Sequence, residues 1–154
     1  MKFLVMFITG IHEKLNKMKR GHLETYPVKI LLAFTEALSG NVKFFHFLMK
    51  NKFPELAMLV ESIRGGEQSV QWLIKNGFPQ FAAFDSAVHG DKKALMWLNK
   101  YNFKMLIRLA EASNAQPVAI KWFNENDLKI FVMIARKINS FNEQQVFDVH
   151  KRRF

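Results

Sequence analysis

The sequence of 154 residues contains no cysteine, which excludes disulfide bonds, thiolate metal sites and cysteine nucleophiles together. This absence also agrees with a reducing compartment, and we expect a cytoplasmic protein. The chain holds no run of about 20 apolar residues, the length that a helix needs to cross a membrane. We therefore expect no integral membrane association.

Sequence motifs of common enzyme families are missing as well. The chain contains no G-x-G-x-x-G, no Walker loop, no H-E-x-x-H and no G-x-S-x-G. From their spacing we assign none of the five histidines to a metal site or a catalytic dyad: His12, His22, His46, His89 and His150. We expect no catalytic residue, no metal and no cofactor, and the alternative is an enzyme site assembled from residues distant in sequence.

Apolar residues, in contrast, are plentiful. They make up 49% of the sequence and include 16 Phe and 3 Trp, so a core can form without a metal or a disulfide. A chain of this length fits one domain and can bury about 70% of its unfolded surface.

The sequence repeats itself every 25 residues. The recurring markers are a glycine, a bulky ring followed by an apolar residue, and an asparagine. The glycines are Gly40, Gly65 and Gly90; the rings are Phe47, Trp72, Trp97 and Trp122; the asparagines are Asn51, Asn76 and Asn126. A fixed period of this length is the signature of a repeat architecture.

Each unit predicts two short helices, at about 42–50 and 54–64 in the first full copy. Asn41 suits the N-terminal cap of the first helix, and Pro54 suits the first turn of the second. We expect Asn51 to end the first helix because asparagine tolerates the left-handed conformation, and glycine to end the second. Helices this short are marginal alone, so each pair must pack on its neighbours.

The bulky rings of the repeat are expected to fill the space between units. We predict that Phe47, Trp72, Trp97 and Trp122 form a ladder, each burying roughly 150–250 Å² between successive copies. The alternative is an exposed aromatic platform for nucleic-acid bases or a ligand.

The period divides the chain into a series of segments within a single domain. We expect an N-terminal capping helix at 1–21, a degenerate first unit at 22–40, full repeats at 41–65, 66–90, 91–115 and 116–140, and a C-terminal capping helix at 141–154. Ser140 and Glu143 form a capping box that predicts the start of this last helix.

The first residues also carry a weak likeness to a signal peptide, Met1-Lys2 followed by six apolar residues. The apolar run is at or below the minimum length, and no small-x-small cleavage site follows. Apolar residues instead continue at near-helical spacing, so we predict an amphipathic helix over 2–19, with a secretory signal as the alternative.

The period and the paired short helices resemble those of α-solenoid proteins as a class, over about residues 22–150. The period is similar to that of leucine-rich-variant repeats, whose units are also two short helical segments. The chain departs from that group in its Trp-Leu and Asn-x-Phe markers and in lacking a cysteine cluster. We expect an all-α fold, a right-handed α-α superhelix of about four 25-residue units with helical caps.

A net charge of +10 is the one feature of the sequence that indicates a partner. Lys50, Lys75 and Lys100 are in repeat register, and Glu125 stands where a fourth lysine would be. Each lysine closes a helix, where a cation complements the helix dipole. The alternative is a row of lysines that follows a phosphate backbone.

We therefore expect a non-catalytic binding or scaffolding module that presents a curved surface to a protein or peptide. The alternative function is electrostatic nucleic-acid binding along a basic face that includes Lys50, Lys75 and Lys100. A third is peripheral attachment to an anionic membrane through the helix at 2–19.

Overall fold

The computed structural model describes residues 20–151, and the side chains as far as Val146. Within this part of the chain every regular element is a helix, and no strand occurs. The all-α prediction is confirmed there. Most of the capping helix predicted at 1–21 lies outside the described residues.

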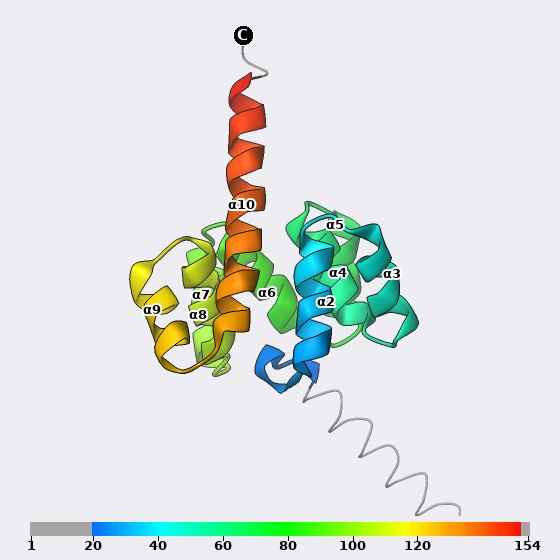
Figure 1. Cartoon of the computed structure of the whole chain (residues 1–154), viewed down its shortest axis with the longest axis horizontal. Coiled ribbons are helices and arrows are strands. Elements are labelled where there is room, and N and C mark those ends of the chain that lie inside the picture. Colours follow the sequence, from blue (N-terminus) through cyan, green and yellow to red (C-terminus); the bar gives the residue numbers. More distant parts are fainter. Residues whose placement is uncertain (1–19, 152–154) are drawn as a thin grey trace, which may run out of the picture.

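The helices follow one another at the predicted period (Figure 1). A short 3-10 turn, η1 (Leu23–Thr25), precedes α2 (Val28–Leu38); then come α3 (Val42–Lys50), α4 (Pro54–Ile63), α5 (Glu67–Lys75), α6 (Pro79–Val88), α7 (Lys92–Lys100), α8 (Lys104–Ser113), α9 (Pro117–Glu125) and α10 (Lys129–Lys151). Helices α3, α5, α7 and α9 begin 25 residues apart, and so do α4, α6, α8 and α10. The predicted helix boundaries are therefore confirmed to within one residue in the full units, except for the end of α10.

Local sequence sets the turns that end α2, α4 and α6. Gly40, Gly65 and Gly90 have φ angles of 89°, 99° and 88°, in the left-handed region where glycine has no steric penalty. The next helix then starts on a cap: the Asn41 side chain accepts a bond from the backbone N–H of Lys43 at 3.2 Å.

The core lies along the even-numbered helices, which we call the inner helices: α2, α4, α6, α8 and α10. Each inner helix buries two large apolar residues in the same register, at most 2% exposed: Leu31 and Phe34, Leu56 and Leu59, Phe81 and Phe84, Leu106 and Leu109, Phe131 and Ile134. Burial of a side chain of this size contributes about 1.5–3 kcal/mol.

The inner helices contact one another in cyclic order. Each contacts the next one along the chain, and the last, α10, contacts the first, α2. Arg64, the residue after α4, contacts both of these helices: its guanidinium group lies 3.4 Å from the Leu38 carbonyl on α2 and 4.9 Å from the centre of the Phe141 ring on α10. The array therefore returns to its own beginning.

The odd-numbered helices, the outer helices, each contact the inner helix before and the inner helix after them. Outer helix α3 thus contacts α2 and α4, and α9 contacts α8 and α10. Consecutive helices accordingly pack neighbour to neighbour through the described part of the chain.

The C-terminal capping helix predicted at 141–154 does not begin at Ser140, because α10 runs without a break from Lys129 to Lys151. Earlier units turn at a residue with positive φ, and Ala115 does so just before Pro117 begins α9. Position 140 is a serine in helical conformation, and Asn142 stands in the register of Pro117. With neither glycine nor proline to stop it, the helix continues past the other inner helices (Figure 1).

Candidate binding surfaces

The asparagine markers end the outer helices by a mechanism different from the predicted one. Asn51 has φ −90°, outside the left-handed region, and the residue after it, Lys52, has φ 67°. The Asn51 side-chain amide instead donates to the Phe47 carbonyl at 2.7 Å, and Asn76 and Asn126 repeat this bond at 2.8 Å with the Trp72 and Trp122 carbonyls. The asparagine side chain therefore adds a second hydrogen bond to a carbonyl that already accepts the backbone N–H of the same residue.

The bulky rings lie at the edge of the core. Phe47, Trp72, Trp97 and Trp122 are each half-buried against it, whereas the residues that follow them are 0% exposed: Leu48, Leu73, Leu98 and Phe123. Trp72 stacks on Phe78 at 6.4 Å between ring centres, and Trp97 on Phe103 at 6.0 Å, each within its own unit. The ring stacking of these two tryptophans is therefore within a unit, whereas the sequence analysis predicted a ladder between units.

One ring of the repeat does bridge two units. The guanidinium group of Arg108, on α8, lies 4.3 Å from the centre of the Trp122 ring on α9, a cation–π contact.

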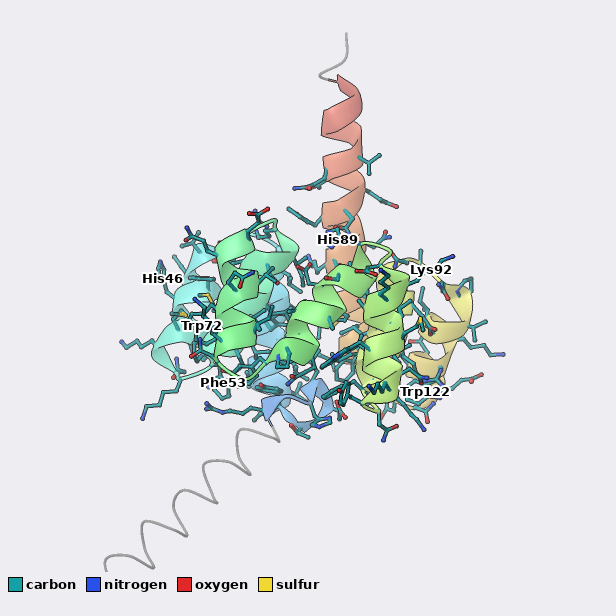
Figure 2. All side chains as sticks on the ribbon, turned by 180° about the vertical axis from the view of Figure 1, so that it is seen from behind. His46, Phe53, Trp72, His89, Lys92 and Trp122 are labelled. Atoms are coloured by element: carbon teal, nitrogen blue, oxygen red, sulfur yellow. The ribbon has the colours of Figure 1, made fainter. Side chains whose placement is uncertain are left out.

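The lysines in repeat register take equivalent positions on three outer helices. Lys50, Lys75 and Lys100 are all exposed and lie at the last positions of α3, α5 and α7. Figure 2 shows Phe53 and Trp122 at one end of the molecule, and His89 and Lys92 at the opposite end. Exposed Tyr101 follows Lys100, whose Nζ lies 5.4 Å from the centre of the tyrosine ring.

Two buried carboxylates belong to the inner helices. The first, Glu55 on α4, is 1% exposed and accepts a hydrogen bond of 2.9 Å from the Tyr26 hydroxyl. Arg20 Nε lies 3.8 Å from the same carboxylate. Burial raises the pKa of Glu55, against the bonds it accepts and the Arg20 charge, and burial followed by the Glu55 charge raises the pKa of Tyr26. This group attaches the segment before α2 to α4.

The second buried carboxylate, Asp85 on α6, lies beside His89. His89 Nδ1 is 3.3 Å from Asp85 Oδ1 but 2.8 Å from the Asp85 backbone carbonyl, and within the described residues Oδ1 has no hydrogen-bond partner of good geometry. Burial raises the pKa of Asp85, and the nearby His89 opposes that effect. The i,i+4 spacing of this pair on a helix is a signal that our assignment of the histidines from sequence missed.

The surroundings of Asp85 include a hydroxyl group. Ser62 Oγ, on the neighbouring α4, donates to the Leu59 carbonyl at 3.0 Å, so its proton is used within its own helix. In the described part of the chain, no three His, Asp or Glu side chains gather as a metal ion would require.

Two hollows of the described surface are lined by a mixture of apolar and charged residues. One, of about 260 Å³, lies between α2, α3 and α4 and is lined in part by Ala37, Phe45, His46, Glu61 and Arg64. Another, of about 500 Å³, runs along α9 and is lined by Pro117, Ile120, Lys121, Asn124 and Glu125. Both combine apolar walls with charges of both signs.

Searches for similar proteins give nothing to compare these surfaces with: no family model matches the chain, and neither does a curated protein or a solved structure. None of the helices between residues 20 and 151 is long and apolar enough to cross a membrane.

The sequence analysis also missed a set of exposed apolar residues on two inner helices. Val28 and Leu32 on α2 are 62% and 43% exposed, and Met133 on α10 is 45% exposed. From their helical spacing they are indistinguishable from core residues, because their exposure depends on which helices cover α2 and α10.

Proposed function

We propose that this chain is a non-catalytic helical-repeat module that binds a protein or peptide, and that its helix pairs wind as a right-handed α-α superhelix. The unbroken neighbour-to-neighbour packing of α2 to α10 supports the architecture. Because α10 contacts α2, the surface that stays accessible is mainly that of the outer helices.

The observation that carries the proposal is the apolar character of this outer layer. Each outer helix leaves a large apolar side chain in solvent: Val42 and Met49 on α3, Ile74 on α5, Met96 on α7 and Val118 on α9, between 42% and 78% exposed. Single exposed apolar residues are common, but here one or two recur on each of four successive helices. A protein partner would bury them at little conformational cost to the rigid array.

The proposal can be tested by affinity capture from a cell lysate treated with nuclease. We expect the full chain to retain a protein partner in high salt, and the Met49→Ser/Ile74→Ser variant to retain less of it. The Glu67→Gln variant, a change of an exposed residue on α5, serves as the control. Retention of nucleic acid alone, lost at high salt, would contradict the proposal.

Nucleic-acid binding is a second candidate, favoured by one observation. Lys50, Lys75 and Lys100 end three outer helices, and Lys100 lies beside the exposed ring of Tyr101; lysines with an aromatic ring are the elements of a single-strand binding surface. We expect any such binding to weaken steeply with salt, and the salt slope to fall when the three lysines are changed to glutamate. An absence of binding to a single-stranded oligonucleotide in 50 mM salt would eliminate this candidate.

A further inference from the structure

One pair of neighbouring inner helices has no outer helix packed against it in the described part of the chain. The five inner helices in cyclic order form five neighbouring pairs, and α3, α5, α7 and α9 each contact both members of one pair. The pair that closes the ring, α10 and α2, has no such helix among residues 20–151. Figure 1 shows α10 and α2 with no ribbon in front of them. We call this place the fifth outer position.

The exposed residues of α2 mark the face that an outer helix would cover. Leu32 is 43% exposed, whereas three of the four residues in its register on later inner helices are buried, Ala57 at 0%, Ala82 at 7% and Val132 at 4%, and the fourth, Ile107, is partly buried. Those later helices each contact the outer helix that precedes them in the chain, and α2 has no preceding outer helix in the described part. The face of α2 that Leu32 and Val28 occupy is therefore a normal contact face of this repeat, left uncovered.

Helix α10 exposes the corresponding face on the other side of this position. The register of Lys137 is elsewhere small and buried, at Ala37, Ser62, Ala87 and Ala112, each at most 3% exposed. Ala37 lines the hollow between α2, α3 and α4 together with Phe45 of the following outer helix. On α10 no outer helix follows, and Lys137 and Met133 are exposed.

We propose that the fifth outer position binds one amphipathic helix of a partner protein whose polar face is acidic. This inference rests on the proposed protein-binding function and names the partner class. Val28, Leu32 and Met133 supply an apolar centre. On the same two helices, within four residues of one of these three, are four exposed basic side chains, Lys29, Lys129, Arg136 and Lys137, and one exposed acidic side chain, Glu36.

The geometry of the repeat fixes the size of the partner helix. All four outer helices are nine residues long, and a helix of that length spans about 13 Å. An isolated helix this short is unstable in water, so the partner segment would gain its helical form from the contact with α2 and α10, as outer helices of the chain do.

The basic charge around this position favours an acidic partner helix over other segments that could occupy it. Residues 1–19 contain four lysines and a single acidic residue, Glu13, so their charge repels the basic rim. A second copy of the chain would bring the same net charge of +10 to this basic rim. A nucleic acid would satisfy the basic rim but leave the apolar centre in water.

The absence of cysteine makes a direct test of occupancy simple, because an introduced cysteine is the only thiol in the chain. The full-length Leu32→Cys variant reports on the fifth outer position. The Met96→Cys variant, at an exposed residue of α7, is the matched control. The rate of thiol labelling by a small maleimide is measured for each, and circular dichroism verifies that both are folded.

The probe is a synthetic peptide of residues 66–78, a sequence that already fits an outer position, with Gln68→Glu, Gln71→Glu and Lys75→Glu. The control peptide carries lysine at positions 67, 68 and 71. At ten times its Kd, we expect the acidic peptide to slow labelling of Leu32→Cys about tenfold and to leave Met96→Cys unchanged. The control peptide is expected to slow neither.

Three results would overturn the proposal. The first is slow labelling of Leu32→Cys in the chain alone, which would place residues 1–19 or, if dilution restores labelling, a second copy in this position. The second is protection by a 20-nucleotide single strand but not by the acidic peptide. The third is no protection by either. If lysate proteins are still captured through the Met49 and Ile74 surface, the third result removes this site and leaves the proposed function intact.

Discussion

The outer helix α7 offers a matched pair of truncations that tests how the repeat is held together. Leu98 is 0% exposed, whereas Met96, two positions earlier on the same helix, is 72% exposed. Leu98→Ala removes a side chain that is fully enclosed, so the protein loses its transfer free energy and gains a cavity, at a total cost of about 2–5 kcal/mol. Met96→Ala removes atoms that are already in water, and it is expected to change the free energy of unfolding by less than about 0.5 kcal/mol.

Urea denaturation followed by tryptophan fluorescence measures both variants, since Trp97 lies between the two positions. For a domain of this size, each kcal/mol lost from the free energy of unfolding lowers Tm by about 2–4 °C, so Leu98→Ala should lower Tm by roughly 4–20 °C. The midpoint should fall with an unchanged m-value. Equal losses from the two variants would refute the assignment of Leu98 to the core and of Met96 to the surface.

Two smaller effects follow from the same structure. Asn76→Ala removes the amide that donates to the Trp72 carbonyl and should lower the free energy of unfolding by about 0.5–1.5 kcal/mol, as measured by urea denaturation. Asn99→Ala, a change at an exposed residue of α7, should lower it less. Equal losses would contradict the role of the Asn76 side chain. The raised pKa of Glu55 means that the folded chain binds a proton more readily than the unfolded chain, so this group lowers stability as pH rises above its ordinary pKa of 4.5. Glu55→Gln, which still accepts the Tyr26 hydrogen bond and matches Gln80 in the next unit, should therefore stabilise the chain at pH 7 more than at pH 4 in thermal denaturation, and a larger gain at pH 4 would contradict the assignment.

The sequence was sufficient to predict the units and their helices because each signal for them is local. A glycine with positive φ, a capping Asn41 and a proline in the first turn act within a few residues, and the 25-residue period repeats them. Local signals also misled: the Ser140 capping box lacks a preceding glycine and a following proline, so α10 passes through it. The asparagine marker was recognised, but its hydrogen bond to the Trp72 carbonyl could be identified only from geometry.

The candidate site was beyond prediction for a different reason. Whether Leu32 and Met133 are core or surface depends on whether α10 returns to α2, and that depends on small rotations summed over four units. Bulky Trp72 was also harder to place than Leu73, since a large ring can stack at the edge of a core while a smaller residue fills it.

The most direct test of the account is the distance between α2 and α10, which is measurable by pulsed electron spin resonance on the Leu32→Cys/Met133→Cys variant carrying two spin labels. If the inner helices close into a ring, the two helices are neighbours at about 8–10 Å between axes, and the labels should give a single short, narrow distance. An open array would separate them by four such steps, about 32–40 Å. A broad distribution at that longer distance would contradict both the closure and the fifth outer position.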